Sequence, residues 1–229
     1  MTMENPKDYR IKIVTGHYHI ASPEQKKMIQ ELFGEDAEHK YEVYFHWHNV
    51  LHELGHAIMM FNADSRPHPA EEEQLVNNFA YAYWKYYGEQ EKLDYLCSIV
   101  NETIQRFSTP THNNESYLDY AKNVWGTEEL YSFNNYGWFQ FSSVQAATKE
   151  SPNLEQALNR MCSTKVSPQP VKTLKYDIDH QMASHIVADA VKLLKEWGVL
   201  LPDGNEIVFC DDVNCHMCQV ENIYDGRVF

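Results

Sequence analysis

The clearest pattern of apolar residues runs from Trp47 to Phe61. Apolar side chains recur there at helical spacing, which predicts an amphipathic helix. The stripe consists of Trp47, Val50, Leu51, Leu54, Ile58 and Phe61. His52, Glu53 and His56 lie off this stripe. We therefore expect one face of the helix to pack in the core and the other to line a polar cleft.

The rest of the chain is rich in helix signals and poorer in strand signals. Apolar periodicity, with start and stop residues such as Ser22-Pro23 and Gly34, predicts further helices. They cover residues 23–33, 70–87, 90–107, 117–125, 128–149 with a break near Gly137, 153–161 and 179–197. Short β-prone runs predict strands within 10–20, 41–44 and 206–210. The predicted fold is α+β, predominantly helical with a small β-sheet.

One stretch stands out as a linker. Residues 163–173 contain two prolines and show no apolar period. We therefore predict one domain over residues 1–162 and a C-terminal helix-strand segment over residues 173–229. That segment could pack on the same domain.

Composition restricts the function. The chain has 229 residues and is 43% hydrophobic, as a folded domain requires. It lacks an apolar run of about 18 residues, so we expect no membrane span, and its first residues lack the apolar stretch of a signal peptide. We therefore expect a cytoplasmic protein. A net charge of −14 disfavours binding to nucleic acid, and the sequence leaves the oligomeric state undetermined.

The polar face of the 47–61 helix carries the sequence His52-Glu53-Leu54-Gly55-His56. Histidines four residues apart lie on one face of a helix and can bind one metal ion. The adjacent Glu53 can act as general base on a metal-activated water, as in the His-Glu-x-x-His pattern of zinc hydrolases. The motif predicts a Zn²⁺ cofactor and a peptide or protein substrate.

A hydrolytic zinc site usually has three protein ligands. The metzincin extension would place Gly at position 59 and His at position 62, but Met59 and Asn62 stand there. The third ligand is then expected on the next helix, where Glu71, Glu72 and Glu73 follow one another.

Two of these glutamates are the stronger candidates. Glu73 has Asn77 one turn later, and that amide could hold His52 or His56 through its second ring nitrogen. Glu72 shares a face with apolar residues, which suggests packing. We favour Glu73 as the ligand and keep Glu72 as the alternative.

The HELGH motif together with Glu73, Asn77, Phe79 and Ala80 resembles the ImmA/IrrE-type metallopeptidases. The resemblance covers roughly residues 40–85, with Val76 in place of the usual Ala. It implies a zincin-like core of the gluzincin type, with Glu as third ligand. The family's Leu-Leu-Met-Pro-like helix end and its helix-turn-helix partner domain are not evident, so repressor cleavage is not implied.

Several further residues are candidates for the site. His48 precedes His52 by one turn and could approach the metal or its surroundings; alternatively it is a partly exposed histidine at a helix start. A peptidase also needs a donor for the oxyanion. The sequence does not choose among the candidates, which are His112, Tyr117, Tyr136, His180 and His185.

The C-terminal segment contains Cys210, Cys215 and Cys218 within nine residues. This spacing could form a second metal site, although we favour reduced thiols without a metal. A non-enzymatic alternative also remains for the whole chain. In that case the HExxH motif would stabilise a protein-binding or regulatory module.

Overall fold

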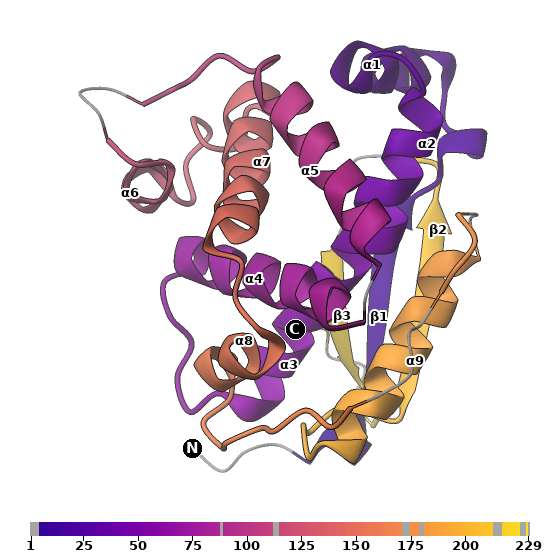
Figure 1. Ribbon diagram of the computed structural model, residues 1–229, viewed down its shortest axis with the longest axis vertical. Helices are drawn as coiled ribbons and strands as arrows, with labels where there is room; N and C mark the ends of the chain where they lie inside the picture. Colours follow the sequence, from indigo (N-terminus) through magenta and orange to yellow (C-terminus); the bar gives the residue numbers. More distant parts are fainter. Residues whose placement is uncertain are drawn as a thin grey trace.

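The computed structural model describes residues 5–87, 89–111, 115–170, 175–178, 181–212, 217–224 and 228. Helices pack mainly on one side of a small three-stranded sheet, so the fold is α+β as predicted (Figure 1). The α-helices are α1 (Pro23–Phe33), α2 (Ala37–Tyr41), α3 (Val50–Asn62), α4 (Pro69–Tyr87), α5 (Gln90–Ile104), α6 (Tyr117–Val124), α7 (Phe133–Glu150), α8 (Leu154–Met161) and α9 (Met182–Glu196).

The sheet joins the two ends of the chain. Strand β1 (Tyr9–Gly16) lies in the centre, parallel to β2 (Gly204–Cys210) and antiparallel to β3 (Met217–Asn222). Ile11 and Ile13 of β1 are fully buried against the helices. Arg10 and Lys12 alternate with them on the other face and form ion pairs with Glu221. The N-terminal strand is therefore paired with strands from beyond the predicted linker.

Helices α3 and α4 form the centre of the helical layer and contact each other closely. A Cβ atom added to Gly55 would lie 2.7 Å from the Cβ of Val76. A glycine inside α3 is therefore explained by the close approach of α4. Trp47 and Trp84 stack at 4.3 Å between ring centroids, and the Trp84 indole donates to the Trp47 carbonyl at 3.0 Å.

The predicted strand over residues 41–44 is wrong. Residues Glu42–Asn49 form a π-helix that continues directly into α3. Tyr41 and Val43 favour strands by propensity, but both are buried by packing against helices. Tertiary packing has overridden a short β-prone run here.

Other boundaries also differ from the prediction. Helix α7 passes through Gly137 without a break. A Cβ atom added to Gly137 would lie 2.6 Å from the Phe107 ring, so the close approach of this ring explains the glycine. Strand β3 was not predicted, and residues 18–20 form a 3-10 turn.

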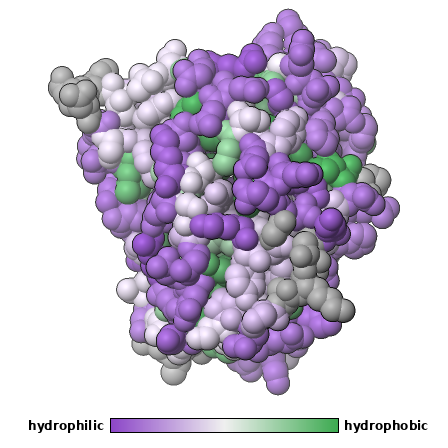
Figure 2. Space-filling model, viewed as in Figure 1, coloured by the Kyte–Doolittle hydropathy of each residue, from purple (hydrophilic) through white to green (hydrophobic). Residues whose placement is uncertain are grey.

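None of the helices among the described residues has the length and apolar character that a membrane span requires. The face in Figure 2 is mostly hydrophilic, with small separate hydrophobic patches.

Candidate metal centre

The HExxH residues lie together on α3. One ligand atom from each of His52, Glu53 and His56 can be chosen so that all three lie within 4.8 Å of one another. The two imidazole rings are 5.0 Å apart, and His52 and Glu53 are buried. The α-helical spacing of four residues produces this convergence. The group could hold a metal ion.

Each imidazole is fixed through its Nδ1 atom by a residue of α4. His52 Nδ1 lies 2.9 Å from Oδ1 of Asn77, and His56 Nδ1 lies 2.7 Å from Oε1 of Glu72. Both partners are acceptors, so each Nδ1 carries the proton and each Nε2 keeps its lone pair when the imidazole is neutral. This is the tautomer required for metal binding through Nε2.

The carboxylate of Glu73 lies opposite both Nε2 atoms. The distances are 3.2 Å from Oε2 to His52 and 3.6 Å from Oε1 to His56. Burial disfavours the charged form of each group, but the hydrogen bond and opposite charges of His52 and Glu73 outweigh it. The pKa of His52 is raised to about 9 and that of Glu73 is lowered to about 2. In the metal-free protein, a proton on His52 therefore offsets the charge of Glu73.

Glu53 is held by a residue of its own helical run and affects two titratable groups on other elements. Asn49, one turn earlier, donates to Oε1 of Glu53 at 3.1 Å. Burial and then the charge of Glu53 raise the pKa of the Cys218 thiol on β3. Burial and the charge of Glu73, with a smaller effect of Glu53, raise the pKa of Tyr136 on α7. The charge of Glu53 therefore acts on groups of both β3 and α7.

Arg66 completes the surroundings of Glu72. Its guanidinium forms two hydrogen bonds to the Glu72 carboxylate, one of them from Nε at 2.7 Å. Glu72 is 4% exposed, and this pairing satisfies a buried charge. A hollow of about 370 Å³ opens beside these residues and is also lined by His56 and Glu73.

Of the residues suggested as oxyanion donors, the structure places one beside Glu73 and others apart from it. The Tyr136 hydroxyl accepts from Gln140 Nε2 at 3.0 Å, and the same amide lies 2.9 Å from Oε2 of Glu73. Tyr117 instead donates to Gln74. His185 is exposed on α9. His112 and His180 lie outside the described residues.

His48 is not the partly exposed histidine suggested as the alternative for it. It is fully buried within the π-helix, and neither ring nitrogen has a hydrogen-bond partner among the described residues. Burial, followed by the nearby charge of His52, lowers the pKa of His48 to about 3. His48 is therefore neutral at physiological pH.

The C-terminal cysteines are not brought together as one site. Cys218 pairs with Ile13, whereas Cys210 pairs with Gly16 across the other edge of β1. Positions three residues apart along a strand face opposite sides of the sheet. Cys210 and Cys218 therefore cannot share one ion in this arrangement, and Cys215 lies outside the described residues. None of the cysteines among the described residues forms a disulfide bond.

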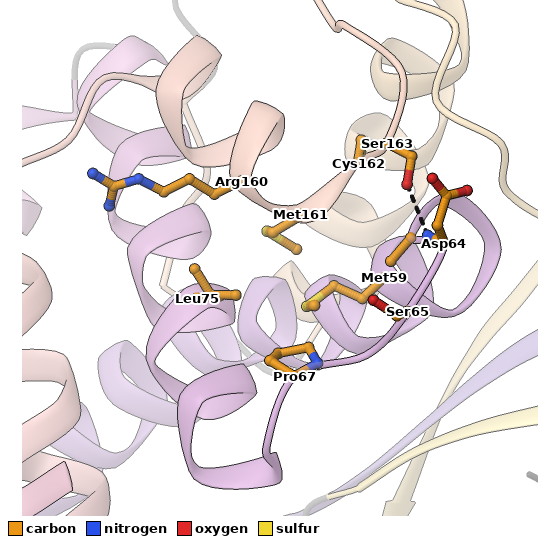
Figure 3. A pocket seen from close by; sticks show the side chains of 10 residues that line it. Met59, Asp64, Ser65, Pro67, Leu75, Arg160, Met161, Cys162 and Ser163 are labelled. Carbon is orange, nitrogen blue, oxygen red and sulfur yellow. Dashed lines mark hydrogen bonds between the residues drawn. The ribbon is translucent and has the colours of Figure 1, made fainter.

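A second hollow, of about 360 Å³, lies between the end of α3, the loop that follows it and the end of α8. Figure 3 shows Met59, Leu75 and Met161 in its lining, with Ser163 accepting a hydrogen bond from the Asp64 amide at 2.7 Å. None of the HExxH residues lines it.

Sequence reasoning did not identify Asn49, Arg66 and Gln140. Asn49 precedes Glu53 by four residues, and Gln140 follows Tyr136 by four, so helical spacing could have indicated both. Arg66 lies in a loop whose path gives no comparable signal.

Comparisons with protein-family models, with curated proteins and with solved structures found no match for this chain. The resemblance to ImmA/IrrE-type peptidases therefore rests on the motif residues alone. The fold and the convergence of His52, Glu53 and His56 define a helical α+β protein with a group able to bind metal.

Proposed function

We propose that this protein is a zinc-dependent peptidase of the gluzincin type, with His52, His56 and Glu73 as its metal ligands. The observation that carries the proposal is the position of Glu73 against the Nε2 atoms of both histidines, at 3.2 and 3.6 Å. Both Nδ1 atoms are already held, by Asn77 and Glu72. Two imidazoles and one carboxylate are a common donor set of hydrolytic zinc.

The same contacts support Glu73 over Glu72 as the third ligand. Glu72 is occupied by Arg66 and by the Nδ1 side of His56, away from the shared face of the two rings. Its role in the proposal is to orient His56, as carboxylates commonly do for metal-bound histidines.

The residues present fit a hydrolytic mechanism. Zinc held here would supply Lewis acidity, lowering the pKa of a water molecule and polarising the scissile carbonyl. Glu53 accepts the proton from the attacking water and transfers it to the leaving amine. Asn49 holds the Glu53 carboxylate in place for this transfer.

Tyr136 is the candidate best placed to stabilise the oxyanion. Its hydroxyl is anchored by Gln140, whose amide also bonds Glu73, so it lies beside the proposed ligands. Its raised pKa keeps the phenol protonated and able to donate a hydrogen bond.

Strand β3 is suited to hold the substrate. It is an edge strand of the sheet, and it contacts α3, the helix that carries Glu53. An extended peptide could pair with its outer edge as an additional strand. Only its far end is occupied among the described residues, by the bridge from Glu221 to Val228.

The test combines metal analysis with a point variant. We expect the purified protein to contain close to one zinc per chain and to cleave peptides from a mixed library. Glu53→Gln should retain the zinc and lower kcat by about 10²–10⁴-fold, because it removes the general base. Glu71→Gln is the matched control, since Glu71 pairs with Lys122 away from the histidines.

Two results would reject the proposal. Protein without zinc after purification and reconstitution would exclude the metal site. Zinc binding without any cleavage that depends on Glu53 would favour the non-enzymatic binding module.

A further inference from the structure

Three aromatic side chains extend from the candidate site to the surface; we refer to Trp125, Tyr131 and Tyr136 as the aromatic ridge. The Tyr131 and Tyr136 rings are 5.7 Å apart between centroids, and Trp125 and Tyr131 are 6.4 Å apart. These separations correspond to direct aromatic contact. The ridge is therefore one continuous surface.

The inner end of the ridge adjoins the proposed catalytic groups. Tyr136 accepts from Gln140, and the same amide lies 2.9 Å from the Glu73 carboxylate. The far end lies near the start of α4, where Trp125 contacts His68 at 6.1 Å between centroids.

The middle of the ridge is open. Tyr131 is 54% exposed, although its neighbours Trp125 and Tyr136 are partly buried. An exposed aromatic ring held by two others is a rigid surface that loses little conformational entropy on binding. The inner ring of the ridge, Tyr136, shares Gln140 with Glu73, which suggests that the bound group belongs to the substrate.

We propose that the aromatic ridge binds a large apolar or aromatic side chain of the peptide substrate, close to the scissile bond. This inference rests on the proposed peptidase function and adds a substrate class to it. Tyr131 would supply the contacting ring face, and Trp125 would hold Tyr131 in place.

The hollow in Figure 3 is the competing site for such a side chain. It is also partly apolar, through Met59, Leu75 and Met161. The ridge is favoured because Tyr136 shares a hydrogen-bonding partner with Glu73, whereas the hollow contains none of the proposed ligands.

The experiment compares two exposed aromatic residues that lie two positions apart. Phe133 is 55% exposed, like Tyr131, but it packs on Phe107 at 6.0 Å between centroids and is not part of the ridge. Tyr131→Ser and Phe133→Ser therefore remove similar exposed rings at different places. Each variant is assayed on paired peptides that carry Phe or Ala at successive positions around the cleavage site.

We expect the wild type to prefer Phe over Ala at one of these positions. Tyr131→Ser should reduce kcat/KM for the Phe peptide by about 2–10-fold and leave the Ala peptide nearly unchanged, because only the Phe peptide loses a contact between aromatic rings. Tyr131→Phe should keep the preference, and Phe133→Ser should not alter it.

Three outcomes would overturn the inference. The first is cleavage by the wild type without any preference for Phe. The second is an equal loss for both peptides in Tyr131→Ser. The third is a preference removed by Ser65→Trp, which obstructs the competing hollow, and not by Tyr131→Ser. The absence of any Glu53-dependent cleavage would instead reject the proposed function, so the two failures are distinguishable.

Discussion

The π-helix and α3 together carry four histidines, in two pairs with different surroundings. His52 and His56, on α3, each have one nitrogen held by a residue of α4 and the other facing Glu73. His46 and His48, in the preceding π-helix, lack this arrangement. His46 contacts Glu42 through Nδ1 and the Gly16 carbonyl through Nε2, at 2.9 Å for the latter. His48 has no hydrogen-bond partner among the described residues.

The difference follows from helix geometry as well as from neighbours. Along α3, a spacing of four residues places His52 and His56 on one face. His46 and His48 are only two residues apart, so their side chains do not share a face of the helix. A histidine resembles a metal ligand only where one nitrogen is anchored and the other meets an acidic group. His52 and His56 satisfy both conditions and share one carboxylate, that of Glu73. His46 satisfies them only with a carboxylate of its own, that of Glu42, and His48 satisfies neither.

The largest expected effect comes from removing that acidic group. Glu73→Gln should weaken zinc binding by more than about 100-fold, because a direct ligand contributes more than a residue that orients one. Glu72→Gln should weaken zinc binding by about 10–100-fold, the usual effect of losing an orienting partner. Competition with a chromophoric chelator measures both affinities.

Glu71→Gln provides the control in the same helical turn. Glu71 contacts Lys122 and neither His52 nor His56. The zinc affinity of the Glu71→Gln variant should therefore match that of the wild type. If Glu72→Gln weakened binding more than Glu73→Gln, the assignment of the third ligand would be reversed.

The contact between α3 and α4 supports this geometry and gives the second prediction. Gly55→Ala would place a methyl group 2.7 Å from the Val76 Cβ, so the helices must separate. We expect a loss of about 1–3 kcal/mol in the free energy of unfolding, as for other overpacked cores. Urea denaturation measures this loss.

A double variant shows whether the contact with Val76 is the cause. Val76→Gly removes the Cβ that Gly55→Ala would meet, although it is itself destabilising. The double variant should therefore lose less free energy than the sum of the two single changes. Simple additivity would show that Gly55 is required for another reason.

Much of the helical fold could be predicted from the sequence, because apolar periodicity and capping residues are local signals. The capping box of Ser22 and Gln25 and the start at Pro23 define the beginning of α1 in this way. The π-helix and β3 were missed because they depend on packing between distant segments. Cys218 and Gln219 have little strand preference of their own, and their pairing with β1 places them in the sheet.

The candidate site shows the same limit. Spacing within α3 brought His52, Glu53 and His56 together on one helix, as the structure has them. Spacing could also connect Glu73 with Asn77, but it could not establish which side of each imidazole faces which carboxylate. That depends on the crossing of α3 and α4. The interaction of Arg66 with Glu72 depends in addition on the path of a loop.

The last prediction concerns His48, and it tests how the two pairs of histidines differ. The pKa of His48 is lowered to about 3 by burial and by His52, whereas an unfolded histidine titrates near 6.5. Between these values the unfolded chain binds more protons at this residue than the folded protein does. The contribution of neutral His48 to the free energy of unfolding is thus complete above about pH 6.5 and decreases as the pH falls, by at most about 1.4 kcal/mol per pH unit.

His48→Leu removes this dependence. The free energy of unfolding of this variant relative to the wild type should therefore increase steadily from pH 7 to pH 4.5. Urea denaturation in the presence of a chelator measures this without competing metal release, and His185→Gln, at an exposed position on α9, is the control. A difference between His48→Leu and the wild type that stays constant over this range would mean that His48 is not held neutral by its burial.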